Sequence, residues 1–208
     1  MSVESDVQAA PAQAPAAPAG NPALLGLPTF LPAGITLGLW LVGYLPADLP
    51  GGMIAASVGS AGVFLLIATV WAARLGASAV AGIFGTFSAF WLSLGLMLMG
   101  LNNGWFGLTD AAQVGSVLTP YVLSWLIVFV ALTLATLRLP LAFTVGFVLV
   151  SATFALLLAN LLTGQAIFST LAGLTTFGFC AVYAYIFFDA MGQELGGRAM
   201  PMGNALVK

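Results

Sequence analysis

The stretch NPALLGLPTFLPAG, residues 21–34, begins the first long apolar run of the chain, directly after an Ala/Pro-rich tail. Asn21 is a good helix N-cap, and Pro22 suits the first helical position because its missing N–H would lack a partner there anyway. The pair therefore predicts the start of a membrane helix. Backbone N–H groups after Pro22 would carry partial positive charge, so they could hold an anion without lysine or arginine. An ordinary capped membrane helix would have the same sequence features.

The composition is that of a membrane protein. Of 208 residues, 61% are hydrophobic and only 5% are charged, whereas a soluble domain carries roughly 25% charged residues. Six apolar runs come close to the roughly 20 residues that span a bilayer as a helix, and they lie at 24–45, 52–73, 79–99, 118–138, 141–162 and 168–190. These runs are too long and too uniformly apolar for barrel strands. We therefore expect an all-α membrane protein with six transmembrane helices packed as a bundle.

The few charges predict how the chain is oriented. With six spans, every lysine and arginine falls on one side of the membrane: Arg74, Arg138, Arg198 and Lys208. The positive-inside rule places that side, and both termini, in the cytoplasm. We expect residues 1–20 to form a disordered cytoplasmic tail, 21–203 a six-helix transmembrane domain, and 204–208 a short cytoplasmic tail.

Residue types that carry catalysis are scarce. The chain has no histidine and a single cysteine, Cys180, and no nucleophile or acid–base pair is placed for catalysis within a span. We expect no enzymatic activity, no cofactor, no metal ion and no nucleic-acid partner. The remaining signals are typical of a lined path: Phe87, Phe90 and Trp91 lie on one face of the third span, and Asn160 interrupts the apolar fifth span. Phe87 and its neighbours would equally suit a packed core, and Asn160 a helix–helix hydrogen bond.

Five segments carry a resemblance to a known family. NPALLGLPTF (21–30) closely resembles the Asn-Pro-Ala-Pro-Leu-Gly-Leu signature of the acetate uptake transporter family, also called the succinate–acetate permease or YaaH-type family. FSAFW (87–91), FGLTDA (106–111), FALLLAN (154–160) and AVYAYIFFDAMGQELGGRAMPMG (181–203) are similar to its later segments, in the same order. The resemblance implies a homo-hexamer of six-helix protomers, each with a pore that passes small monocarboxylates such as acetate. Both proton coupling and channel-like passage are compatible with it.

The resemblance also implies which residues line the path. The candidates in the signature are Asn21, Pro22, Ala23, Leu24, Gly26 and Leu27. Others follow in the spans: Phe30, Phe87 and Val150 where the family narrows its pore, and Phe90, Trp91 and Asn160 beside it. If transport is coupled to protons, Asp189 and Glu194 are the candidate proton-linked residues. We expect Phe30 and Phe87 to form an apolar gate, because apolar constrictions can close a pore by excluding water.

The chain departs from the family pattern at several positions. Leu24 replaces a proline of the signature, and Phe87 replaces a tyrosine. In the second span, Leu65 and Ala72 stand where the family usually carries glutamine and glutamate. These changes make the path more apolar and disfavour a dicarboxylate such as succinate. Two further interpretations stay open: a transport-inactive membrane scaffold or assembly subunit, and a channel for a small neutral solute.

Overall fold

The computed structural model describes residues 20–46, 48, 50–108 and 110–208, and their regular structure is helical. The elements are α1 (Ala23–Leu41), α2 (Gly51–Ala55), the π-helix η1 (Ala56–Gly62), α3 (Val63–Arg74), α4 (Ser78–Asn102), α5 (Ala111–Thr136), α6 (Leu141–Thr163) and α7 (Ala166–Glu194). Because α2, η1 and α3 continue into one another, the described residues contain six helices long and apolar enough to cross a membrane. The predicted all-α fold with six spans is confirmed. Apart from residue 20, the predicted disordered tail lies outside the described residues.

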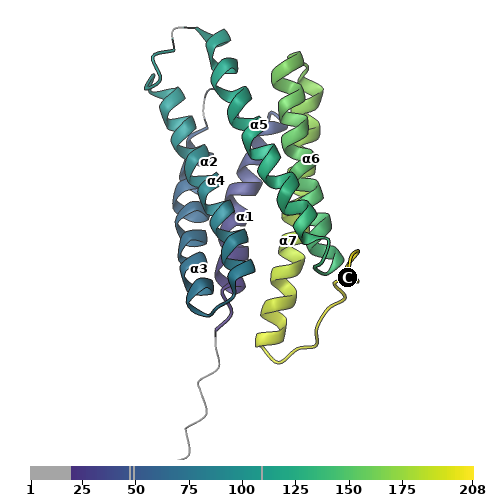
Figure 1. Cartoon of the computed structure of the whole chain (residues 1–208). Helices are drawn as coiled ribbons and strands as arrows, with labels where there is room; N and C mark the ends of the chain where they lie inside the picture. Colours follow the sequence, from purple (N-terminus) through teal and green to yellow (C-terminus); the bar gives the residue numbers. More distant parts are fainter. Residues whose placement is uncertain (1–19, 47, 49, 109) are drawn as a thin grey trace, which may run out of the picture.

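The spans pack as two groups of three (Figure 1). In the first group, α1 and α4 pack against the second span, whereas in the second group α6 lies between α5 and α7. Extensive packing of α1 against α7 joins the groups, and α4 and α5 touch only slightly although they are consecutive in the chain. The interior between the groups is therefore lined by side chains from both.

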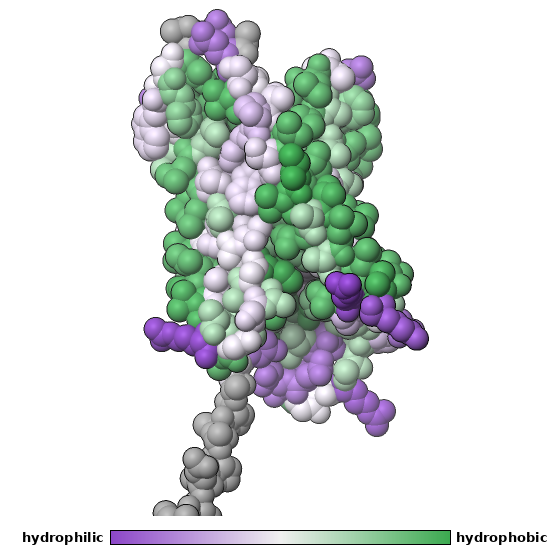
Figure 2. Space-filling view, viewed as in Figure 1, coloured by the Kyte–Doolittle hydropathy of each residue, from purple (hydrophilic) through white to green (hydrophobic). Residues whose placement is uncertain are grey.

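The outer surface fits a lipid environment. On the face seen in Figure 2, apolar residues cover much of the middle of the molecule on either side of a paler strip, and hydrophilic residues gather at its two ends. Large apolar side chains such as Leu66, Ile127 and Leu134 are about half exposed or more. Exposing this much apolar surface to water is unfavourable, whereas lipid solvates it. The molecule is a multi-pass membrane protein.

The positive residues gather at one end, as predicted from an even number of spans. The N–H groups of Leu206 and Val207 both donate to the carbonyl of Leu137 at 3.0 Å, which ties the C-terminal segment to the α5–α6 turn. Gly20 packs against Trp71, near the end of α3. Arg74, Arg138 and the C-terminal segment therefore share the lower end of Figure 1.

Three helix ends differ from the prediction by about one turn or more, and one of them is the end of α7, which reaches Glu194 instead of residue 190. The first span was expected to reach residue 45, but α1 ends at Leu41 because Gly43 adopts φ +80° and the N–H of Tyr44 turns back to the Leu39 carbonyl at 2.9 Å. Such left-handed glycine ends are common. The fourth span was expected from residue 118, but α5 begins at Ala111 because the Asp110 carboxylate accepts from the Gln113 N–H at 3.0 Å. This side-chain cap fixes an earlier start.

The π-helix η1 is held by serine hydroxyls of its own span and of α4. Ser88 Oγ of α4 donates to the Gly62 carbonyl at 2.8 Å, and Ser60 Oγ of η1 donates to the Thr29 carbonyl of α1 at 2.5 Å. In lipid, polar groups must find partners within the protein. These hydrogen bonds therefore lock the second span between α1 and α4, on one wall of the interior.

Candidate functional site

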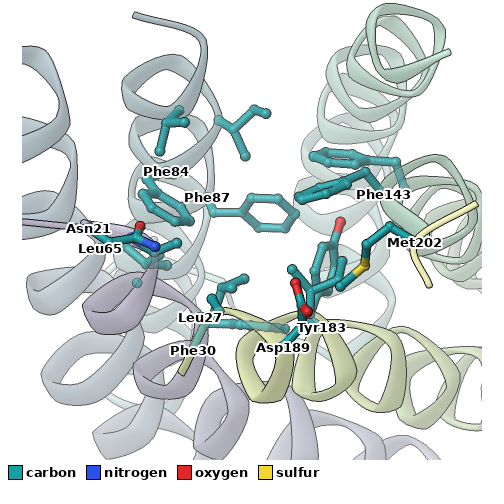
Figure 3. Close-up of a pocket in the computed structure, with 17 residues that line it drawn as sticks. Asn21, Leu27, Phe30, Leu65, Phe84, Phe87, Phe143, Tyr183, Asp189 and Met202 are labelled. Carbon is teal, nitrogen blue, oxygen red and sulfur yellow. The ribbon is translucent and has the colours of Figure 1, made fainter. Parts of the chain in front are cut away.

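A cavity of about 250 Å³ opens at the lower end of the bundle, and we call it the lower cavity (Figure 3). Its walls come from α1, α3, α4, α6, α7 and the C-terminal segment, and they are overwhelmingly apolar. The apolar lining includes Gly26, Leu27, Phe30, Leu65, Phe84, Phe87, Phe143, Phe147, Ile186 and Met202. Only three lining residues have polar side chains that can hydrogen-bond: Asn21, Tyr183 and Asp189.

A second cavity, of about 280 Å³, lies toward the opposite end, and we call it the upper cavity. Its lining comes from α1, α4, α5, α6 and α7, and its apolar members include Leu37, Leu41, Phe90, Leu94, Val122, Phe154 and Leu157. Trp40, Tyr121, Asn160 and Ser169 contribute polar atoms. The two cavities share no lining residue.

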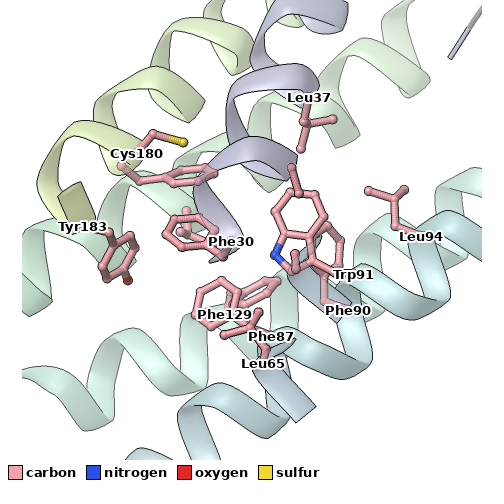
Figure 4. Packing of buried hydrophobic residues seen from close by; sticks show 14 of the residues in the cluster. Phe30, Leu37, Leu65, Phe87, Phe90, Trp91, Leu94, Phe129, Cys180 and Tyr183 are labelled. Carbon is pink, nitrogen blue, oxygen red and sulfur yellow. The ribbon is translucent and has the colours of Figure 1, made fainter. Parts of the chain in front are cut away.

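Packed aromatic rings separate the two cavities, and Figure 4 shows several of them in contact at the centre of the bundle. We call this set the aromatic layer, and it comprises Phe30, Phe87, Phe90, Phe129, Phe147 and Phe154. Ring centroids are 6.2 Å apart for Phe30–Phe87, 5.2 Å for Phe87–Phe129, 4.8 Å for Phe129–Phe154 and 5.2 Å for Phe90–Phe154. Every ring of the set is at most 8% exposed. The conformation is therefore closed, with an apolar barrier between two small cavities.

The start of α1 differs from the expectation in one respect. Asn21 Oδ1 accepts from the Ala23 N–H at 3.0 Å, and the Leu24 N–H donates to the Asn21 carbonyl at 3.1 Å. The next two N–H groups, those of Leu25 and Gly26, both donate to the Pro22 carbonyl. The N–H groups after Pro22 are therefore already engaged and cannot act as free donors to an anion. This correction follows from the helical dihedrals of Pro22 (φ −60°, ψ −21°), which tighten the first turn.

The lower cavity contains a carboxylate without a cation. Asp189 is 8% exposed; its Oδ1 accepts from the Met200 N–H at 2.6 Å and its Oδ2 from Gln193 Nε2 at 2.8 Å. Among the described residues, no lysine or arginine lines the cavity. The two donors bring one hydrogen bond to each oxygen, an arrangement that suits an ionised carboxylate. The cavity therefore carries a fixed acidic group at its mouth.

Tyr183 contributes a different kind of polar group. Its side chain is 5% exposed, and its hydroxyl oxygen is buried with no hydrogen-bond partner among the described residues. Its ring contacts Phe30 edge-on at a centroid distance of 5.4 Å. Most buried polar side chains have a partner, so this hydroxyl is an exception at the lower face of the aromatic layer.

The structure divides the predicted path residues into three sets. Those that line the lower cavity are Asn21, Ala23, Gly26, Leu27, Phe30, Phe87 and Asp189. Phe90 and Asn160 line the upper cavity. Five line neither cavity: Pro22, Leu24, Trp91 and Val150, which lie elsewhere in the bundle, and Glu194, which is exposed at the end of α7.

Sequence reasoning missed two residues of the central region. Tyr183, Ile186 and Ala190 recur at i, i+3 and i+7 and line the lower cavity together, so helical periodicity could have identified Tyr183. Phe129 is fully buried between the two groups of spans. It lies in a uniformly apolar run, where no periodicity distinguishes it from lipid-facing neighbours.

Comparison with known proteins identifies the family. Residues 4–194 match the GPR1/FUN34/yaaH family. The chain belongs to this family. The resemblance seen in the sequence is thereby confirmed for nearly the whole chain.

Two individual proteins of similar size extend this comparison. The solved structure of the bacterial acetate channel SatP superposes with a TM-score of 0.76 at 28% sequence identity, covering 88% of this chain and 99% of that one. An uncharacterised protein of Methanothermobacter thermautotrophicus is 28% identical over 181 residues, or 86% of this chain and 88% of the relative. This member of the GPR1/FUN34/yaaH family therefore shares its six-span fold with a channel.

Proposed function

We propose that this protein carries acetate and similar small monocarboxylates across the cell's inner membrane and is not an enzyme. The observation that carries the proposal is the pair of cavities in one protomer, separated by a single aromatic layer, in a fold similar to that of an acetate channel. The path would run from the lower cavity through the aromatic layer to the upper cavity. Phe30 and Phe87 would form the gate, since both line the lower cavity at that layer.

Assembly and orientation belong to the same proposal. We propose a homo-hexamer with both termini in the cytoplasm, so that the lower cavity opens to the cytoplasm. The gathering of arginines at the lower end supports the orientation. The fourth span supports assembly, because only 11% of it is buried within the protomer, against 33–44% of the other spans. Its apolar surface is thus available to lipid or to a neighbouring protomer.

Acetate must cross the aromatic layer without most of its hydration shell, which is expensive for an anion. Hydrogen-bond donors on both sides would shorten the distance that acetate crosses without water. These donors are the Asn21 amide below the aromatic layer, and Asn160 and the Trp40 indole above it. Coupling to a proton would remove the charge instead. Of the two expected proton-linked acids, we retain Asp189, which lines the lower cavity, over the exposed Glu194.

The direct test is uptake of labelled acetate into proteoliposomes, compared with empty liposomes because neutral acetic acid leaks through lipid. Saturable uptake above the empty control is expected. If an inward proton gradient accelerates the protein-dependent part, transport is coupled; if it does not, passage is channel-like. Uptake equal to that of empty liposomes would contradict the proposal and favour the scaffold interpretation.

A further inference from the structure

The buried hydroxyl of Tyr183 has no structural role that its surroundings reveal. It lies in the wall of the lower cavity, and Figure 3 shows it on the side where Phe143, Met202 and Asp189 also lie. Behind it is Gly146 of α6: a Cβ built there would lie 3.1 Å from the hydroxyl oxygen. Gly146 therefore offers no acceptor side chain behind the hydroxyl, whose oxygen is buried in the wall of the cavity that Tyr183 lines.

Leaving this hydroxyl without a partner is costly. A buried, unsatisfied hydroxyl destabilises the folded state, whereas phenylalanine would fill almost the same space and retain the aromatic contacts with Phe30, Phe87 and Phe147. The cost disappears when a ligand in the cavity supplies an acceptor. A carboxyl oxygen is such an acceptor, and the cavity is large enough for a small carboxylic acid.

We propose that Tyr183 is a cargo-binding residue whose hydroxyl donates a hydrogen bond to a carboxyl oxygen at the lower face of the aromatic layer. The inference rests on the proposed transport function and adds a specificity-determining residue to it. It also supplies a hydroxyl donor to a path in which the third span contributes Phe87, a side chain that cannot form a hydrogen bond. The donor comes from α7 instead, and its ring lies 6.3 Å from that of Phe87.

The position of Asp189 then restricts the cargo to one carboxylate. It follows Tyr183 by six residues, a rise of about 9 Å along α7. A dicarboxylate bound at Tyr183 has two choices for its second carboxylate. Toward the mouth it approaches the Asp189 carboxylate, a like charge with no cation lining the cavity; toward the centre it enters the aromatic layer, which has no polar side chain. A monocarboxylate avoids both penalties because its other end is apolar.

The test of the donor is Tyr183→Phe in the full-length protein, with Tyr44→Phe as the matched control. Tyr44 is 74% exposed in the loop after α1 and lines neither cavity, so the same atom is removed outside both linings. We expect Tyr183→Phe to raise the half-saturation concentration for labelled acetate about tenfold, as expected when a hydrogen bond to a charged group is lost. Its thermal stability in detergent should equal or exceed that of the wild type.

The outcomes separate this inference from the proposed function. Wild-type uptake with an unchanged half-saturation in Tyr183→Phe would overturn the inference while leaving the transport function standing. Absence of saturable uptake by the wild type would overturn both. Loss of uptake together with a lower melting temperature would indicate a packing role and would also overturn the inference.

The selectivity claim has its own test, competition of unlabelled succinate against labelled acetate. We expect succinate to compete poorly in the wild type and at least several-fold better in Asp189→Asn. Asparagine can still accept from the Met200 N–H, and Gln193 can rotate its amide to accept from the new side-chain N–H, so the fold should be retained. Strong competition in the wild type, or no change in the variant, would overturn the role of Asp189.

Discussion

The upper and lower cavities have similar volumes and mostly apolar walls, but their polar groups differ. In the upper cavity the protein itself fixes three of the four: Ser169 Oγ donates to the Leu41 carbonyl at 2.8 Å, Asn160 Nδ2 donates to the Gln165 carbonyl at 3.0 Å, and Tyr121 Oη pairs with Ser93 Oγ at 3.0 Å. In the lower cavity, the Tyr183 hydroxyl has no partner in the part of the chain that the structure describes, and Asp189 adds a carboxylate.

This difference predicts separate roles for the two cavities: the upper cavity lets small anions pass, and the lower cavity selects among them. The remaining donors of the upper cavity are the second N–H of Asn160 and the indole N–H of Trp40, a lining residue whose nitrogen is buried without a partner among the described residues. Hydrogen-bond donors with no acid nearby bind small anions without distinguishing one from another. The lower cavity has an acid, Asp189, in the same lining as its donors Asn21 and Tyr183, so it distinguishes among anions. We therefore expect substitutions below the aromatic layer to change selectivity and substitutions above it to change mainly affinity.

The largest effect is expected in the aromatic layer between the cavities, in Phe87→Ala. The ring of Phe87 contacts Phe30, Phe129, Phe147 and Tyr183, and its removal should cost about 3–5 kcal/mol of folding stability. The gap would enlarge the lower cavity toward Phe129 and thin the aromatic layer, so acetate uptake per folded protein should rise and the preference for acetate over succinate should fall. Uptake and thermal melting of the same preparation measure both effects.

The control for this variant is Phe188→Ala, since Phe188 is 69% exposed on the outer surface of α7. It should leave uptake and selectivity unchanged. If Phe87→Ala is too unstable to purify, Phe87→Leu removes the ring with a smaller loss of volume. Unaltered flux and selectivity in a folded Phe87 variant would exclude Phe87 from the gate.

The next effect is expected behind Tyr183, in Gly146→Ala. The added methyl group would lie 2.9 Å from Cζ and 3.1 Å from Oη of Tyr183, so the tyrosine ring must move. Overpacking of this kind costs about 1–3 kcal/mol. We expect weaker acetate binding and altered acetate-to-succinate selectivity, measured by competition uptake.

The matched control is Gly82→Ala on α4, where a Cβ would meet nothing within 4 Å. Alanine there should leave uptake intact and stabilise the helix by up to about 1 kcal/mol. Equal behaviour of the two glycine variants would mean that the position of Tyr183 does not matter to transport, contrary to the expectation.

The sequence predicted the fold more completely than the site, for a physical reason. Six apolar runs are local signals, because lipid requires each span to satisfy its own backbone. The site depends on which faces of the helices meet, and uniformly apolar spans lack the polar–apolar periodicity that reveals a face in a soluble protein. Asn21 and Phe87 could be assigned to a path from a family signature, whereas Phe129 could not. Tyr183 needed its unpartnered hydroxyl to be noticed, which is visible only in three dimensions.

The smallest effect is expected above the aromatic layer, in Asn160→Leu. The change removes the hydrogen bond to the Gln165 carbonyl, which is exposed and can bind water instead, so stability should fall by only about 0.5–1.5 kcal/mol. It also removes the second N–H from the upper cavity while Trp40 remains. The half-saturation concentration for acetate should therefore rise about two- to threefold, since neutral hydrogen bonds contribute little each. Because none of the described residues that line this cavity is an acid, the acetate-to-succinate preference should stay at the wild-type value. A changed preference in Asn160→Leu would show that the upper cavity also selects the cargo, and the division between passage above and selection below would then fail.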